Sequence, residues 1–404
     1  MRGDEHGAAR FARRRQAGNV LVLFALCAFG LLAVAALVID VGLARVAQVQ
    51  MQTSADAGAL EGVRARDGDP DGQVDYAALP DDDARDSQRR ERVRDLVARA
   101  ADPDMDLSTT TSEERVQGAG AVVGLTGGLG GATQASLDLN VEADPSGRFY
   151  RPDLQENPAN EVHGDQLAGS WDPTQTDHGE DRDYTRLDLI PAAAGGTASL
   201  AAEGYLVRLR RTPDLDGLDA RPDVSSNGGP LPLLFGRGAL IPDAPSSTGH
   251  AYRQHGITVR ATAIAQAQPA VRVGPAVPAL NLEGLALTLD RGTWEGLPVT
   301  PAASVAGDPA WLTPDGSSAA VGDAAPLTGT PAALPPAGYV AITEGGLVVG
   351  FGRVALSGTT GAYTLVRTAS PVAARNASAV ALSTAQRASL AAVSHQLLAP
   401  ALVR

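Results

Sequence analysis

The fold is decided by residues 20–39, which read VLVLFALCAFGLLAVAALVI. None of these residues carries a charge or a strongly polar side chain. As an α-helix the stretch spans about 30 Å, which matches the hydrocarbon core of a bilayer. We therefore predict a single transmembrane helix, with the anchor residues Val20, Leu23, Phe24, Leu26, Phe29, Leu32, Val38 and Ile39.

The flanking charges predict how this helix is oriented. Five arginines precede it: Arg2, Arg10, Arg13, Arg14 and Arg15. Only Asp40 and Arg45 lie close behind it. Because cytoplasmic flanks carry the excess of basic residues, we expect residues 1–18 in the cytoplasm and the rest of the chain outside. The alternative is a signal peptide cleaved after Ala35, but the apolar run continues to Ile39, which favours an uncleaved anchor.

The composition predicts a loop-rich chain of short strands. Of 404 residues, 45 are glycine and 27 are proline, and aromatic residues make up 4%. Lys and Arg number 33 against 46 Asp and Glu, so the net charge is −13. This acidic balance argues against nucleic acid as a partner, because a basic surface supplies most of that affinity.

The helix is expected to continue beyond the membrane. Residues 43–63 are rich in Ala, Gln, Val and Leu, and no proline interrupts the chain before Pro70. We predict one helix over residues 19–66, about 70 Å long, whose second half forms a stalk outside the membrane. Its weak apolar face contains Leu43, Val46, Val49, Thr53 and Leu60.

This segment resembles the N-terminal module of TadE/TadG-like proteins of the bacterial Tad (Flp) pilus assembly apparatus. The residues that carry the resemblance are Gly18, Asn19, Asp40, Gly42, Gln52, Ala55, Asp56, Ala57, Ala59 and Leu60. The chain departs from the family pattern at Ser54, Gly58 and Glu61. The resemblance implies a location in the bacterial inner membrane and partners among the other envelope proteins of the apparatus.

The resemblance also raises the question of processing. Prepilins are cut after a glycine, and their fifth mature residue is normally glutamate. A cut after Gly18 would place Leu23 at that position, so we predict no such cleavage. An anchored, TadG-like protein fits this sequence better than a processed, TadE-like one.

The remaining chain predicts an α+β fold with long loops. Residues 67–134 form an acidic and Gly-rich region with one helix over 84–101, whose apolar stripe is Val93, Leu96, Val97 and Ala100. Alternation at 136–143, 197–212 and 256–269 predicts a β-rich extracytoplasmic domain over 135–300. Residues 301–337 predict a linker. Residues 338–404 predict a small β module that ends in a helix over 383–398.

Only one motif indicates a metal. Asp67, Asp69, Asp71 and Asp75 match the first part of a calcium loop, but Ala78 occupies the position of the bidentate glutamate. The alternative is a solvated acidic linker. The six histidines show no zinc spacing, and no G-x-S-x-G elbow is present. We therefore predict no catalytic residue, no cofactor apart from this weak calcium candidate, and no small-molecule substrate.

The sequence thus predicts a single-pass, membrane-anchored envelope scaffold or assembly factor that contacts membrane lipid and pilus-apparatus proteins. A surface-anchored binding or adhesion protein, which would use the same helix only as an anchor, is the alternative. An exported enzyme is a third hypothesis, without a motif to support it.

Overall fold

The structure is a computed structural model. It describes residues 5–66, 78–101, 154, 156–162, 164–171, 189–193, 196–211, 231, 257, 259–275, 283–297, 310–311, 318–325, 337–359, 362–367, 372–373, 377–380, 382, 384–391 and 397–403. The side chains of residues 5–21 are not among those described.

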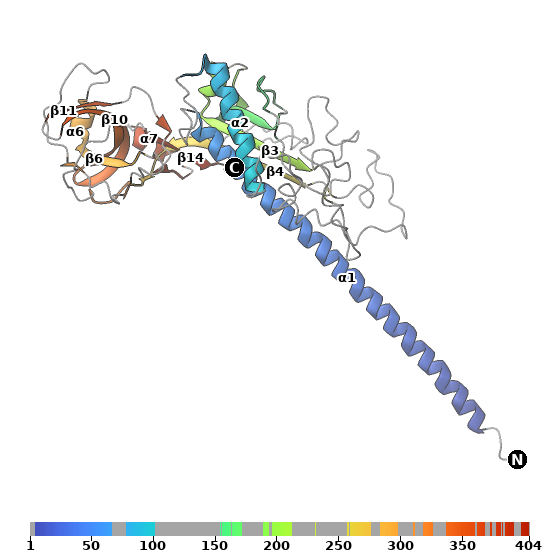
Figure 1. Ribbon diagram of the computed structural model, residues 1–404. Helices are drawn as coiled ribbons and strands as arrows, with labels where there is room; N and C mark the ends of the chain where they lie inside the picture. Colours follow the sequence, from blue (N-terminus) through green and yellow to red (C-terminus); the bar gives the residue numbers. More distant parts are fainter. Residues whose placement is uncertain are drawn as a thin grey trace.

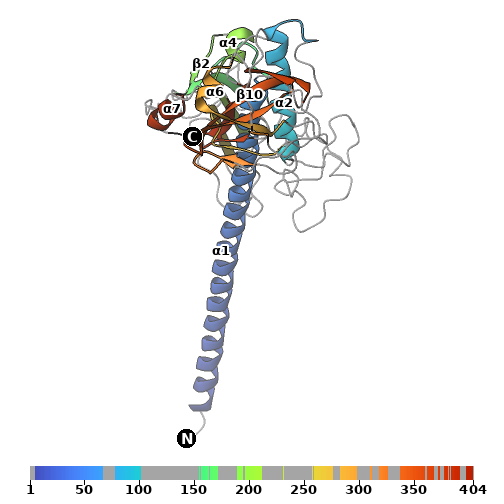
Figure 2. The same ribbon diagram turned by 90° about the vertical axis from the view of Figure 1, so that its left-hand side faces the viewer.

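The predicted long helix is confirmed. Helix α1 spans Glu5–Arg64 without a break and begins before the expected Asn19. Figure 1 shows its first half projecting as a rod that ends at the N-terminus, and Figure 2 shows the same rod from the side. The rest of the described chain gathers around and beyond the other end of this helix. We refer to that part as the body.

The second half of α1 is not the free stalk that we predicted. Ala47, Met51, Ala55, Ala59 and Val63 are each at most 3% exposed. They lie four residues apart, so they form one row along the helix, and this row packs into the largest apolar cluster of the body. The predicted apolar face was also wrong, because Val46 and Val49 are 45% and 64% exposed.

Helix α2, Asp82–Ala101, confirms the predicted second helix and lies against α1. The row Ala47 to Val63 on α1 faces a six-stranded sheet. Its strand order is β12 (Val372–Ala373), β14 (Leu397–Leu402), β4 (Val259–Pro269), β3 (Gly204–Arg211), β1 (Gln166–Trp171) and β2 (Leu189–Pro191). All neighbours in it are antiparallel except β12 and β14.

A second sheet lies at the other end of the body (Figure 1). Its strand order is β11 (Ala362–Arg367), β10 (Leu347–Thr359), β9 (Ala337–Glu344), β6 (Leu285–Asp290) and β7 (Ala310–Trp311). The short helix α6, Arg291–Glu295, follows β6 and buries Trp294. A three-stranded sheet contains β13 (Ala377–Ser378), β5 (Arg272–Val273) and β8 (Ala319–Ala320).

One apolar cluster joins the sheets. It combines Leu397 and Ala399 of β14 with Tyr339 of β9 and Phe351 of β10. Strand β6 precedes residue 300 and belongs to the second sheet, whereas β14 follows residue 338 and belongs to the first. The pairing of strands therefore connects segments on both sides of the predicted linker. The division into domains stays a prediction.

Two local predictions were wrong. The helix expected over 383–398 ends early, because α7 spans Thr384–Ala391 and β14 begins at Leu397. Pro400 cannot continue a helix, and Leu398–Leu402 instead pairs with Ala265–Pro269 of β4. The strand expected from residue 197 starts only at Gly204, because Gly196–Leu200 forms helix α4. The strand expected at 136–143 lies outside the described residues.

Candidate functional site at the helix junction

The first half of α1 presents apolar side chains to its surroundings. Leu23, Phe24, Leu26, Phe29, Leu32 and Val38 are 63–73% exposed, and Ile39 is 43% exposed. Within the described residues, only α1 is long and apolar enough to cross a membrane. These side chains make no contribution to the core of the body. They can therefore be shielded from water only by a membrane or by another apolar surface.

The junction begins at Asp40. This residue directly follows the apolar run, yet only 7% of its surface is exposed. Gly42 lies on the open side of the helix, where a Cβ atom would meet nothing within 4 Å. The backbone of Gly18 and Asn19 is helical, but their side chains are not among those described. The structure therefore places the family-like residues 40–60 in two settings, a short open turn and a packed helix.

The packed part contains most of the family-like residues. Ala55 and Ala59 are fully buried against the six-stranded sheet, and Leu60 packs at the margin of the same cluster. Gln52, Asp56 and Ala57 are half-buried. Small side chains at positions 55 and 59 allow the helix to approach the sheet closely, since a longer side chain would hold the two apart.

Gln52 connects α1 to the backbone of β4. Its amide group donates to the Thr262 carbonyl at 3.1 Å and to the Asp56 carboxylate at 2.7 Å. The carbonyl of Ile264, two residues further along β4, accepts from Val403 at the end of β14. Alternate carbonyls of a strand point to the same edge, so Gln52 continues the pairing of β4 where β14 ends. The side chain thus fixes the height of the sheet along the helix.

Two glycines let α1 fit between α2 and the sheet. A Cβ atom at Gly58 would collide with Val97 of α2 and would lie 3.4 Å from Val207 of β3. A Cβ atom at Gly62 would collide with the ring of Tyr205. Two of the positions that depart from the family pattern, Gly58 and Glu61, therefore face α2.

Glu61 joins the two helices electrostatically. Its carboxylate accepts from Nε of Arg92 at 2.5 Å, and the Glu61 side chain is 8% exposed. The partly buried setting makes this pair worth more than an open surface pair, because water screens it less. The contact sets the rotation of α2 about α1.

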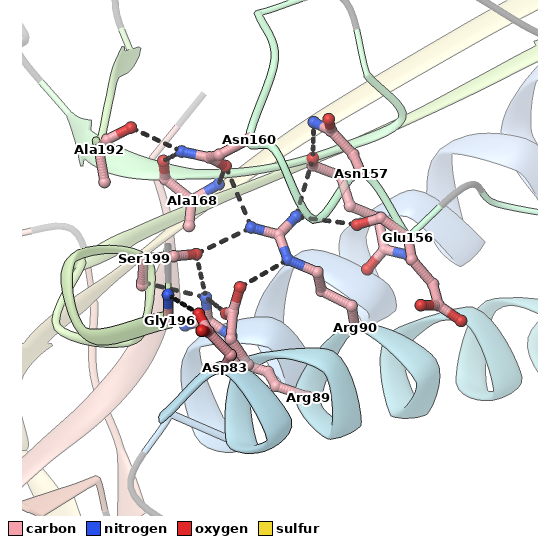
Figure 3. A network of polar contacts seen from close by, with 12 residues as sticks. Asp83, Arg89, Arg90, Glu156, Asn157, Asn160, Ala168, Ala192, Gly196 and Ser199 are labelled. Atoms are coloured by element: carbon pink, nitrogen blue, oxygen red, sulfur yellow. Dashed lines mark hydrogen bonds and ion pairs between the residues drawn. The ribbon is translucent and has the colours of Figure 1, made fainter. Parts of the chain in front are cut away.

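A buried arginine network secures α2 on its other side (Figure 3). Arg89 and Arg90 are 1% and 0% exposed, and both donate to the carboxylate of Asp86, at 2.5 and 2.8 Å. Arg90 also donates to the Ser199 hydroxyl at 2.8 Å and to the Asn160 side-chain oxygen at 3.1 Å. Figure 3 shows its guanidinium surrounded by these acceptors. Full pairing is what makes two buried cations tolerable.

This network connects elements that are distant in sequence. Arg90 donates to the carbonyls of Glu156 and Gln166, and Asn160 bonds both to Ala168 and to the Ala192 carbonyl. Asp83 at the start of α2 accepts from the backbone N–H of Gly196, where α4 begins. The helix α2, the strand β1 and the helix α4 are therefore held as one unit.

The arginine network was missed from the sequence. We predicted that charges fill the outer face of α2, and we assigned Leu96 and Ala100 to its apolar stripe. Ala100 is exposed instead, while Asp86 and Arg90 continue the line of Val93 and Val97 on the buried face. The spacing of three and four residues between an acid and two arginines was the available signal.

Tyr205 lies where α1, α2 and the sheet meet. It is fully buried, its hydroxyl donates to Gln166 at 2.7 Å, and Arg89 lies 4.8 Å above its ring. Burial raises the pKa of the phenol above its ordinary value, although the nearby Arg90 and Arg89 act in the opposite direction. The neutral phenol is thus the form that suits this site.

The arrangement as a whole suits mechanical attachment. In the part of the chain that the structure describes, no group of three or more His, Cys, Asp or Glu side chains could hold a metal ion. Asp67, Asp69, Asp71 and Asp75 lie outside that part, so the calcium hypothesis stays a prediction.

The geometry defines a class of protein in which a membrane-length apolar helix is also the central core helix of a β-rich body. Residues 18–65 match the family described as "Putative Flp pilus-assembly TadE/G-like". This match confirms the resemblance of the N-terminal module and supports a component associated with the Tad pilus. No curated protein and no solved structure matches the chain.

Proposed function

We propose that this protein is a single-pass scaffold or assembly factor of a Tad pilus apparatus. Residues 1–18 lie in the cytoplasm, α1 crosses the bacterial inner membrane, and the body lies outside. Its partners are membrane lipid and other envelope proteins of the apparatus. Its work is done by packing of the helix and of the body's surface, with no catalytic step.

The observation that carries this proposal is the division of α1 into two halves. Val22–Ile39 exposes its large apolar side chains, whereas Ala47 to Val63 is buried at the centre of the body. A helix that is continuous through both halves cannot bend freely between them. Any displacement or rotation of the membrane segment is therefore transmitted to the sheet, as a scaffold requires.

The alternative, an adhesion protein with a generic anchor, differs in what it asks of the membrane segment. An adhesin needs the segment only to hold the protein at the membrane. A scaffold of the apparatus needs its side chains, because they pack against other membrane helices.

An exchange of the anchor separates the two. Residues 20–39 are replaced by an unrelated apolar segment of equal length in the bacterium that encodes the protein, and pili are counted by electron microscopy. We expect a loss of at least tenfold in pili per cell with the protein still in the membrane fraction. The matched control, Cys27→Ala, changes one small apolar residue and should leave the count unchanged. Normal piliation after the exchange would favour the adhesion protein.

A further inference from the structure

The apolar face of α1 is longer than a hydrocarbon core requires. Large exposed apolar side chains run from Val22 to Val49. This length of helix is about 42 Å, at 1.5 Å per residue. A bilayer core is about 30 Å thick, and the bilayer with its headgroup layers is about 40–45 Å thick. The exposed face therefore matches the whole bilayer, headgroups included.

Three valines account for the excess. Val41, Val46 and Val49 follow Asp40 and are 51%, 45% and 64% exposed, on turns that the body covers only from the other side. In water these side chains would form an unshielded strip. In a headgroup layer, apolar side chains contact the upper parts of the lipid chains.

The body begins where the apolar run ends. Asp40 is 7% exposed and Ala47 is 3% exposed, so the body already covers one side of the helix at these positions. Ile39 and Ala47 are about 12 Å apart along the axis. One headgroup layer is about 5–8 Å thick, as the difference between full bilayer and core implies. No bare length of stalk is left between the headgroups and the body.

The register of the sheet shows which end faces the membrane. Gly62 of α1 faces Tyr205, and Gly58 faces Val207, so β3 runs toward the membrane as its numbering increases. Gln52 lies at the level of Thr262. Three residues further along the paired strands, Arg211 and Val259 lie up to about 10 Å nearer the membrane.

This end of the body carries basic residues. Arg45 is exposed on α1, Arg260 is half-buried on β4, and the β3 strand ends with Arg211. Arg210 is already paired with Asp165, and the buried Asp40 carboxylate lies at the same level. In a chain of net charge −13, arginines at the membrane-facing end reduce the repulsion that an acidic body would experience at lipid phosphates.

We propose that the body rests directly on the outer surface of the membrane, against phospholipid headgroups, with the turns from Val41 to Val49 inside the headgroup layer. This inference rests on the proposed membrane anchoring of α1. It adds that the body is a membrane-apposed platform with a fixed height and does not stand on a stalk.

The test is neutron reflectometry of the full-length protein in a supported bilayer of phosphatidylcholine and phosphatidylglycerol. We expect protein density that begins at the headgroup layer without a water-filled gap. The control is a seven-residue alanine-rich insertion between Ile39 and Asp40. Seven residues restore the rotational phase of the helix to about 20° and lift the body by about 10 Å, so a hydrated layer of about that thickness should appear.

Two other results are distinguishable. A hydrated gap under the unaltered protein would overturn the proposal while leaving the anchor in place. A fluorophore on Cys27 reports on the anchor itself, because lipids with a quencher deep in their chains should quench it strongly. Absence of that quenching would instead contradict the membrane anchoring on which the proposal depends.

Discussion

At the scale of single residues, close packing at the junction depends on the absence of side chains. Gly58 and Gly62 are occupied by neighbouring side chains at the points where a Cβ atom would stand. Glycine is a poor helix former, so its presence in the middle of α1 costs stability locally. The contact with α2 and the sheet offsets that cost.

Replacing Gly62 should therefore destabilise the protein although it improves helix propensity. In Gly62→Ala the new methyl group collides with the buried Tyr205 ring, and overpacking of this kind costs about 1–3 kcal/mol. Gly42→Ala in the same helix meets nothing within 4 Å and should be neutral or stabilise by up to about 1 kcal/mol. Thermal unfolding in detergent measures both. Equal melting temperatures for the two variants would be inconsistent with the described junction.

Removing the shared acid of the arginine network should cost more. Asp86→Asn leaves Arg89 and Arg90 buried without their carboxylate, for which we expect a loss of about 3–5 kcal/mol in the free energy of unfolding. Glu295→Gln removes a carboxylate from an open pair with Arg291 and should cost less than about 1 kcal/mol. Denaturant titration of the two variants compares them. A loss below 1 kcal/mol for Asp86→Asn would show that the network is not closed in solution.

The raised pKa of Tyr205 predicts alkaline destabilisation. In the unfolded chain the phenol ionises near pH 10, whereas the buried phenol keeps its proton to higher pH. The stabilisation is therefore complete below pH 10 and is lost as pH rises toward the folded pKa, by about 1.4 kcal/mol per pH unit. Phenolate absorbance, compared between the protein and Tyr205→Phe, should show this tyrosine ionising only on unfolding. A phenolate signal from folded Tyr205 near pH 10 would contradict the burial.

At the scale of elements, α1 is both anchor and core. The cluster around Ala47, Met51, Ala55, Ala59 and Val63 is the largest apolar cluster in the described body. A chain that begins at Asp40 should therefore fold as a soluble protein with a cooperative thermal transition. A chain that begins at Asp67 should not, because one face of the six-stranded sheet is then uncovered. If both chains gave the same circular dichroism and melting temperature, α1 would be a stalk after all.

The sequence predicted the elements of α1 and α2 and several strands, because each depends on local pattern. The 20-residue apolar run, the alternation in β4 and the strands β9 to β11 are local signals. The burial of α1 was not predictable in this way. Its packed face consists of alanines and glycines that carry little hydrophobic contrast, while the larger Val46 and Val49 lie on the open side. The buried arginines of α2 reversed the usual rule that charges face water.

At the scale of the whole molecule, the two ends of the chain meet. Strand β14, close to the C-terminus, lies between β12 and β4 and also contacts α1. It contributes Leu397 and Ala399 to the cluster that joins the sheets. No local pattern indicates such a pairing, since it depends on a partner strand more than 120 residues earlier in the chain.

Removal of residues 397–404 should thus destabilise the whole body. The truncated chain loses the neighbour of β4 and half of the contacts between the sheets, so we expect loss of a cooperative transition or a fall of more than 10 °C in melting temperature. Leu347→Ala is the comparison, because this side chain is 50% exposed and its loss should have little effect. A truncated chain as stable as the intact one would show that β14 is not paired.

The central claim, that an uncleaved helix holds the protein in the membrane as a scaffold, is tested most directly by the intact mass of the membrane-extracted protein. We predict the mass of the chain with Met1–Gly18 retained. A chain that begins at Asn19 would be a processed, pilin-like subunit, accepted by a prepilin peptidase despite Leu23, and would contradict the claim. A chain that begins just after Ala35 would contradict it more strongly, because the membrane helix itself would be absent from the mature protein.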